Sequence, residues 1–348
     1  MKSNTLLRTG TGMAAVALAL AACSSSKPTT TSSAGSSSAA NANAPVATSI
    51  TAPDKAKKNY NIQFIQGVTG DQFYITMQCG AEAEAAKLGV TVKTQGPQKF
   101  DPTLQKPILD SVVAGQPDAI LIAPTDVTAM QTPLKVAAEK GIKVILVDTT
   151  TEDPSYATSA IASDNVGGGK AAFEAIKKLN PNGGKVMVMS TDPGVSTVDL
   201  RIKGFEEAAK ADSKFQYLPV QYSHNDPATA ANLMGSALQK DPDIVGVFAA
   251  NLFSAEGTAT AVKQAGKANT VKIASFDAGP NQVKRLRDGT IQALVAQQPG
   301  IIGQYGVDEA VAALDGGTVT PKVQTGFTII TKDNIDGEGG AAAYKSSC

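Results

Sequence analysis

The chain has 348 residues, more than the roughly 250–300 that one hydrophobic core usually serves, so we expect two domains. Lys and Arg together number 31, and Asp and Glu together also number 31. This balance gives no overall charge that would favour nucleic acid or a membrane surface. We therefore expect no nucleic-acid partner and no membrane contact through the folded body.

The N-terminal residues predict export. Lys2 and Arg8 precede the apolar run 13–20, and small residues follow, which indicates a secretory signal peptide over 1–22 that is too short to span a membrane. The sequence LAAC at 20–23 resembles the bacterial lipoprotein cleavage box, in which the cysteine is lipidated and becomes the mature N-terminus. That resemblance implies a lipid anchor on Cys23 and a place at the outer face of the cell membrane. Ordinary secretion with an incidental cysteine is the alternative.

A polar tether follows the anchor. Residues 23–58 are mostly Ser, Thr, Ala, Pro and Asn, with too few apolar side chains to bury a core, so we expect a disordered linker.

Beyond the tether, short, mostly apolar and β-branched runs alternate with segments whose apolar residues recur at three-to-four spacing, which predicts an α/β body with parallel sheets whose strands are buried on both faces. The expected strands are 61–67, 90–94, 119–123, 142–147, 159–163, 185–189, 216–221, 244–248, 271–276, 291–296 and 323–330. The expected helices are 72–88, 102–114, 126–140, 166–179, 197–211, 227–239, 254–265, 280–287 and 300–314, with Pro107 expected to end or kink the second. These strands are too many for one sheet of ordinary width, so we expect two sheets and two lobes.

One strand-helix-strand pattern occurs twice. The strand 117–123, a helix and a strand ending at Asp148 are repeated by the strand 242–248, a helix and a strand ending at Asp277. Ligands of open α/β sheets bind outside the carboxyl ends of the strands. We therefore expect each half to offer an aspartate to one shared cleft.

Catalytic and metal-binding patterns are absent from the sequence. The glycines at 167–169 lack the spacing of a phosphate-binding loop, there is no G-x-S-x-G, and the single histidine, His224, has no nucleophile near it in sequence. No Cys, His and Asp cluster has metal-ligand spacing. We expect a solvent-facing His224, no cofactor, no metal and no catalytic residue.

Polar and aromatic side chains instead follow several strands: Asp71, Phe73, Tyr74, Asp148, Asn251, Asp277 and Gln297. Carboxylates and amides accept hydrogen bonds from hydroxyl groups, and aromatic planes cover apolar C–H faces. This combination favours a neutral ligand rich in hydroxyl groups.

From Ile62 to Lys332 the chain resembles the ribose-binding type of periplasmic sugar-binding protein, which serves ABC importers. The resemblance lies in QFY at 72–74, APTD at 123–126, VD at 147–148, IASDN at 161–165, RIKGF at 201–205, VFAAN at 247–251, SFD at 275–277 and AQQP at 296–299. It implies a type I fold of two Rossmann-like lobes joined near Ser163, Gln297 and Gly326. The N-terminal lobe would comprise 59–163 and 298–326, and the C-terminal lobe 164–297 and 327–348.

The resemblance also implies a ligand set, with departures. The matching positions are Phe73, Tyr74, Asp148, Arg201, Asn251, Phe276, Asp277 and Gln297. Asp71 stands where ribose binders have Asn, Thr149 where they have Arg, and Asn225 or His224 where they have an aromatic residue. Because the departures remove contacts suited to ribose, we expect a small neutral sugar or a polyol such as a pentitol.

We therefore expect a monomeric, lipid-anchored solute-binding protein that delivers its ligand to an ABC permease. A sugar-type signal or chemoreceptor ligand-binding protein and an exported carbohydrate enzyme are the alternatives, and a repressor would need a helix-turn-helix where this chain has its export signal. With Cys23 lipidated, Cys79 and Cys348 are the remaining pair for an intramolecular disulfide. A half-buried Cys79 and a free terminal thiol are equally compatible with the sequence.

Overall fold

The computed structural model describes residues 46–348. The expected signal peptide at 1–22, the lipidation site Cys23 and the tether as far as residue 45 lie outside the described residues. Within residues 46–348, no helix combines the length and the apolar character needed to cross a membrane.

The first lobe is built on a parallel sheet with the strand order β12-β5-β4-β3-β1-β2. Its strands are β1 (Asn61–Ile65), β2 (Thr91–Gln95), β3 (Ala119–Ile122), β4 (Lys143–Val147), β5 (Ser159–Ser163) and β12 (Lys322–Thr325). Its helices are α1 (Gln72–Leu88), α2 (Pro102–Ala114), α3 (Gln131–Glu139) and α9 (Pro299–Asp315).

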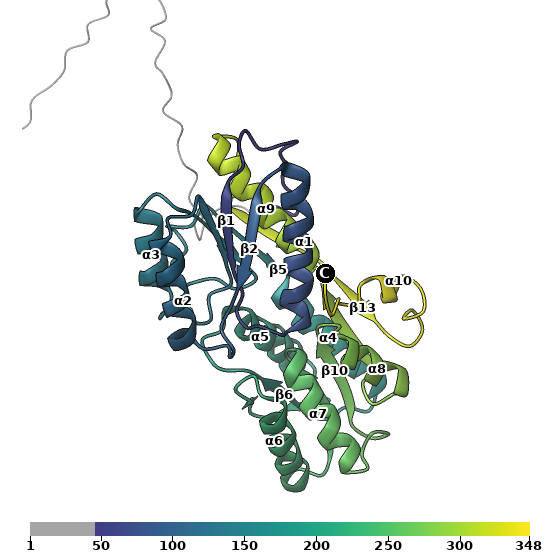
Figure 1. Cartoon of the computed structure of the whole chain (residues 1–348). Helices are drawn as coiled ribbons and strands as arrows, with labels where there is room; N and C mark the ends of the chain where they lie inside the picture. The colour runs from purple at the N-terminus through teal and green to yellow at the C-terminus, as the bar shows by residue number, and fades with distance from the viewer. Residues whose placement is uncertain (1–45) are drawn as a thin grey trace, which may run out of the picture. The chain divides into compact units, whose positions relative to one another are not determined.

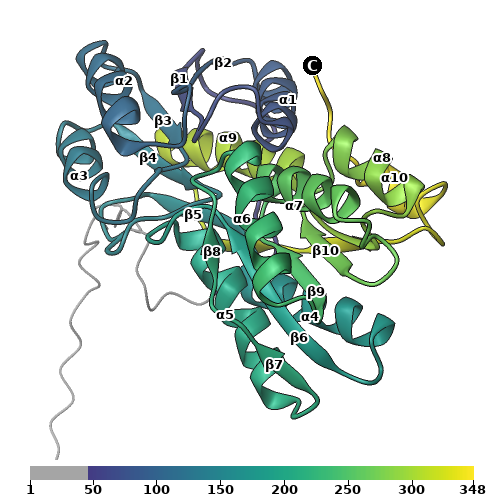
Figure 2. The same cartoon turned by 90° about the horizontal axis from the view of Figure 1, so that it is seen from below.

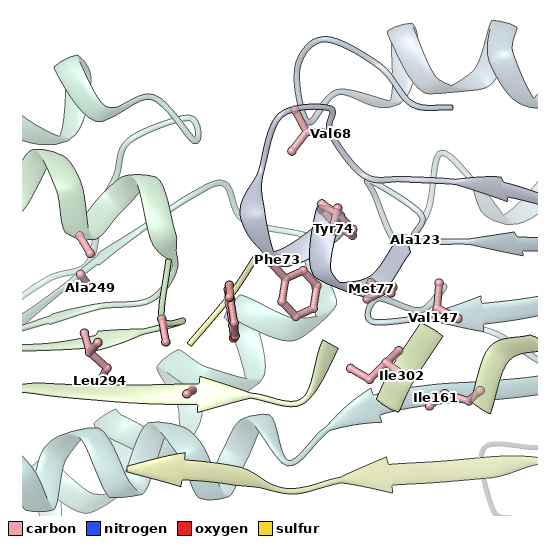
Figure 3. Packing of buried hydrophobic residues seen from close by; sticks show 14 of the residues in the cluster. Val68, Phe73, Tyr74, Met77, Ala123, Val147, Ile161, Ala249, Leu294 and Ile302 are labelled. Atoms are coloured by element: carbon pink, nitrogen blue, oxygen red, sulfur yellow. The ribbon is translucent and has the colours of Figure 1, made fainter. Parts of the chain in front are cut away.

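Both faces of this sheet are covered, because alternate residues of a strand point to opposite sides. Ile120 and Ile122 of β3 belong to the core formed with α2 and α3, whereas Leu121 belongs to the core that includes α1 and α9. Figure 1 shows α1 and α9 side by side, and Figure 3 shows Met77 of α1 near Ile302 of α9. Strand β3 is therefore buried on both faces, as its continuous apolar sequence predicts.

The second lobe has the strand order β13-β11-β10-β9-β6-β7, with β8 also paired to β6. Its strands are β6 (Gly184–Ser190), β7 (Phe215–Tyr217), β8 (Gln221–Tyr222), β9 (Ile244–Ala249), β10 (Lys272–Phe276), β11 (Ala293–Gln297) and β13 (Phe327–Ile330), and β13 runs antiparallel to β11. Its helices are α4 (Asn165–Leu179), α5 (Ser196–Ala211), α6 (Pro227–Lys240), α7 (Leu252–Gln264), α8 (Pro280–Asp288) and α10 (Glu338–Ala341). Figure 2 shows α6 beside α7. The two sheets confirm the expected α/β class.

The chain passes between the sheets three times. It crosses from β5 to α4 after Ser163, from β11 to α9 after Gln297, and from β12 to β13 at Gly326. Hydrogen bonding links these crossings, since the Ser163 hydroxyl donates to Gln297 Oε1 at 2.7 Å and lies 3.5 Å from the Thr325 hydroxyl. The expected single strand 323–330 is wrong, because its two halves pair in different sheets.

Other boundaries also differ from the sequence predictions. Pro107 does not end α2, because the helix continues through it from Pro102 to Ala114. Helix α3 begins at Gln131 rather than 126, because the Asp126 carboxylate accepts from the amides of Thr128 and Ala129 in a turn before it. The expected strand 216–221 divides into β7 and β8, which pair with different parts of β6.

The described end of the expected tether, 46–58, packs on the first lobe. The Ala47 amide donates to Lys322 O at 3.0 Å, the Ala56 amide donates to Leu88 O at 3.0 Å, and the Lys57 ammonium donates to Asp315 O at 2.8 Å. A linker cannot be disordered where its backbone makes such bonds, so the expected boundary at residue 58 lies too far along the chain.

Candidate functional site

The strand order of each sheet reverses direction beside its first strand. The order changes between β1 and β3 in the first lobe and between β6 and β9 in the second. In parallel α/β sheets such a switch point opens a crevice at the carboxyl ends of the strands, where ligands bind.

A cavity lined by residues of both lobes lies at these strand ends. Of the expected ligand-contacting residues, it is lined by Asp71, Phe73, Tyr74, Asp148, Arg201, Asn225, Asn251, Asp277 and Gln297. The structure therefore brings into one place residues from seven separate parts of the chain.

Two expected residues do not line the cavity. The Thr149 hydroxyl donates to Pro124 O at 2.7 Å, so its side chain is used within the first lobe. Phe276 is fully buried, and the Arg201 guanidinium lies 3.8 Å from the centre of its ring. Phe276 therefore supports the arginine rather than offering a face to a ligand. His224 is exposed, as expected, with Nδ1 beside the Asp192 carboxylate.

Six lining residues were not expected from the sequence: Val68, Phe100, Thr191, Val195, Thr197 and Val198. Thr191 follows β6 directly, in the same way that Asp148 follows β4, so its place at a strand end was a usable signal. Phe100 lies in a loop before α2, and no local pattern indicates that its ring reaches the cavity.

Backbone conformation places several of these side chains. Asp148, Asn225 and Asp277 have φ of 64°, 54° and 74°, in the left-handed region that residues other than glycine seldom adopt. Such conformations cost of order 1–3 kcal/mol each and concentrate at functional sites. The strand ends here turn sharply and direct polar side chains to the cavity.

The carboxylate of Asp277 is held by three donors. Gln297 Nε2 donates to Oδ1 at 2.7 Å, the Tyr344 hydroxyl donates to Oδ1 at 3.1 Å, and the Leu252 amide donates to Oδ2 at 3.1 Å. Because Gln297 also accepts from Ser163 at a lobe crossing, the site is directly connected to the hinge.

Arg201 is fixed from within the second lobe. Its Nε donates to Asn165 Oδ1 and its Nη1 donates to Ala250 O, both at 2.8 Å. These two bonds and the Phe276 ring orient the guanidinium, and they leave Nη2 for a ligand.

Two buried polar atoms of the cavity have no hydrogen-bond partner among the described residues: Asp148 Oδ1 and the Thr191 hydroxyl. The other oxygen of Asp148 accepts from the Tyr74 hydroxyl at 2.8 Å. Buried polar groups are nearly always satisfied, so these two atoms are candidate contacts for a bound ligand. Asp148 Oδ1 requires a donor, and a hydroxyl can be a donor or an acceptor.

Burial makes the three carboxyl groups hard to ionise. It raises the pKa of Asp71 to about 7, and the nearby Asp277 charge adds to the rise. Burial raises the pKa of Asp148 to about 6 although Arg201 and Tyr74 oppose the rise. The pKa of Asp277 is also raised by burial, against the effect of Arg201. Among the described residues, no group of acidic, histidine or cysteine side chains could hold a metal ion.

Comparison with known proteins gives consistent matches. The periplasmic binding protein domain matches residues 62–318. The ribose import binding protein of Salmonella typhimurium is 33% identical over 287 residues, which cover 82% of this chain and 96% of that protein. The D-allose-binding periplasmic protein of Escherichia coli is 30% identical over 257 residues, which cover 72% of this chain and 83% of that protein.

Solved structures similar to this chain are also solute-binding proteins of transporters. An ABC transporter solute-binding protein from Agrobacterium vitis, bound with α-D-tagatopyranose, is 42% identical with a TM-score of 0.81, covering 82% of this chain and all of that one. A carbohydrate transporter solute-binding protein from Agrobacterium radiobacter, in complex with D-arabinose, is 29% identical with a TM-score of 0.79, covering 83% and 100%.

Proposed function

Because the chain belongs to the ribose-binding-like family of periplasmic sugar-binding proteins, we propose that it captures a small neutral monosaccharide between its lobes and delivers it to an ABC import permease. The chain is a sugar-binding solute-binding protein of the ABC transporter type and not an enzyme. The identity of the sugar and the delivery step are the proposal.

The unpartnered Asp148 Oδ1 carries the proposal. A sugar hydroxyl that donates to it would satisfy a buried charge, and a hydrogen bond to a charged group is worth roughly 1.5–3 kcal/mol. Thr191, on the opposite lobe, offers a second unpartnered group to the same ligand. One ligand bonded to both lobes would favour the closed arrangement.

The charges favour a neutral ligand. Three carboxyl groups, of Asp71, Asp148 and Asp277, face the cavity against one cation, Arg201. An anionic ligand would bring another negative charge into a buried site to which the described residues contribute one cation, which is costly. Sugar phosphates and sugar acids are therefore disfavoured.

Aromatic rings in the cavity support a ring-form sugar ahead of a polyol. Phe73 and Tyr74 lie at the start of α1 (Figure 3), with ring centres 5.1 Å apart, and Phe100 adds a third ring. Flat rings cover the C–H face of a pyranose better than they cover a flexible chain. We place pentoses and hexoses first and four- to six-carbon polyols second.

The cellular setting is part of the proposal. We propose that Cys23 is lipidated, that the protein is a monomer at the outer face of the cell membrane, and that the lobes comprise 59–163 with 298–326 and 164–297 with 327–348, the packed segment 46–58 belonging to the first lobe. The family and the sequence at 20–23 support this setting.

A thermal-shift panel of neutral sugars, polyols, sugar phosphates and amino acids tests the function. We expect neutral sugars such as D-ribose, D-allose or D-tagatose to raise the melting temperature, and Asp148→Ala and Asp277→Ala each to abolish the rise. Asp110→Ala is the matched control, because Asp110 is an exposed aspartate paired with Lys106 on α2. If only amino acids or phosphorylated sugars stabilise the protein, the proposal fails.

A further inference from the structure

The C-terminal segment, residues 331–348, links the two lobes outside the three crossings. Within this segment the Tyr344 amide donates to Ala278 O of the second lobe at 2.9 Å. The next amide, of Lys345, donates to the Thr76 hydroxyl of α1 in the first lobe at 2.8 Å. The segment ends at Cys348, which is disulfide-bonded to Cys79 of α1.

Tyr344 lies behind the sugar cavity rather than in it. Its side chain is 5% exposed and is absent from the cavity lining. Its hydroxyl donates to Asp277 Oδ1 at 3.1 Å and accepts from the backbone N–H of Gln297 at 2.9 Å. Its ring centre lies 6.0 Å from that of Phe73. Each of those three partners lines the cavity.

We propose that Tyr344 is a positioning residue for the sugar site, and that the Cys79–Cys348 disulfide holds it there. The inference rests on the proposed function. Tyr344 contributes one of three donors that orient the Asp277 carboxylate, and it also touches a residue of the opposite lobe. Supporting contacts of this kind lock the rotamer of a binding group in its productive geometry.

The disulfide restricts Tyr344 because Cys348 lies close to it in the chain. Only three residues separate Tyr344 from Cys348, so the covalent bond to α1 restricts the tyrosine directly. A disulfide is compatible with an extracytoplasmic location. Without it, the chain end would be free to fray, as chain termini generally do.

The pKa of Asp277 gives a measurement specific to the positioning role of Tyr344. The charged or titratable groups that face Asp277 are Arg201 from α5, Asp71 at the start of α1, Asp148 after β4 and Tyr344 itself. Burial raises the pKa of Asp277, and the hydrogen bond from Tyr344 opposes the rise. Removing the hydroxyl should therefore raise this pKa further.

The first test compares Tyr344→Phe with Tyr60→Phe. Tyr60 is a matched control, because it is 4% exposed and its hydroxyl donates to the Asp315 carboxylate at 2.6 Å, outside the cavity. The probe is whichever of D-ribose, D-allose and D-tagatose binds the wild-type protein most tightly in calorimetry. We expect about tenfold weaker binding for Tyr344→Phe and less than a twofold change for Tyr60→Phe. Equal effects of the two variants would overturn the inference.

The second test asks whether the disulfide acts through Tyr344. The double variant C79S/C348S should weaken binding in the same direction as Tyr344→Phe, and adding Tyr344→Phe to it should weaken binding little further. Such non-additivity is the signature of groups that act together. Independent, additive losses would contradict the proposed connection.

A third measurement needs no sugar. Titration of the Asp277 carboxyl by NMR in the sugar-free protein should show a higher pKa in Tyr344→Phe and in C79S/C348S, but not in Tyr60→Phe. An unshifted Asp277 pKa in Tyr344→Phe overturns the inference whether or not a sugar is found. If no sugar of the panel binds the wild-type protein, the proposed function fails, and this titration still decides the role of Tyr344.

Discussion

The substitution Asp71→Asn should make sugar binding less dependent on pH. Asp71 caps α1 by accepting from the Phe73 amide at 2.8 Å, and asparagine caps a helix equally well. Burial in the cavity, which we take as the closed form under the proposed hinge motion, raises the pKa of Asp71 from its ordinary value of 3.8 to about 7. When the lobes separate, water reaches the carboxyl group and we expect its pKa to return toward the ordinary value.

The direction and the size of the pH effect on sugar affinity follow from the difference between the two pKa values of Asp71. Because the closed form has the higher pKa, closure takes up a proton between about pH 4 and pH 7, so affinity falls as the pH rises through that window. The two units between pH 5 and pH 7 correspond to about 2.7 kcal/mol, so binding at pH 8 should be at most about a hundredfold weaker than at pH 5. Sugar hydroxyls that donate to the carboxylate would reduce this effect.

Calorimetry at pH 5 and pH 8 measures the ratio of dissociation constants. Asp71→Asn should reduce the ratio at least threefold relative to the wild-type protein, with the remainder due to Asp148, whose pKa is raised in the same direction. Glu309→Gln is the control, because burial also raises the pKa of Glu309 to about 7 but this residue lies outside the cavity. If Asp71→Asn leaves the ratio unchanged, the closed cavity does not perturb Asp71 as described.

Three further predictions concern location, motion and packing. Cys23→Ala should move the protein from the membrane fraction to the soluble fraction without changing sugar affinity, and a wild-type protein that is already soluble would rule out the anchor. The radius of gyration from X-ray scattering should fall when sugar saturates the protein, and an unchanged radius would count against hinge closure. Gly303→Ala should destabilise the protein by about 1–3 kcal/mol in urea denaturation, since its methyl group would overlap the Met77 carbonyl oxygen where α9 meets α1, whereas Gly235→Ala enters open space on α6 and should be neutral or stabilising. Equal stability of these two glycine variants would contradict the close packing of α1 and α9.

Most of the fold could be predicted because its elements depend on local patterns. Strands such as Ala119–Ile122 are continuous apolar runs, and helices such as α1 end at a glycine in the left-handed conformation, Gly89. The run 323–330 contains several β-branched and aromatic residues, but its division at Gly326 depends on which sheet offers a free edge to each half. Pairing partners of that kind are not encoded in the strand itself.

The residues of the site likewise divide into those that a local sequence pattern predicts and those that depend on the tertiary fold. Asp148 and Asp277 could be predicted because they follow strands directly, and the carboxyl ends of parallel strands meet at one edge. Phe276 is instead the last residue of β10, and because side chains alternate along a strand its ring packs against the Arg201 guanidinium and does not line the cavity. Tyr344 had no signal at all, since its role depends on the path of the C-terminal segment across both lobes.

A crystal structure of the protein grown with the tightest-binding neutral sugar tests the central claim most directly. The account predicts one sugar molecule in the cavity between the lobes, with a hydroxyl within hydrogen-bond distance of Asp148 Oδ1 and further hydroxyls on Asp277 and Asn251. A sugar bound only on the outer surface, or a cavity filled by an anionic or apolar ligand while the sugar is excluded, would contradict it.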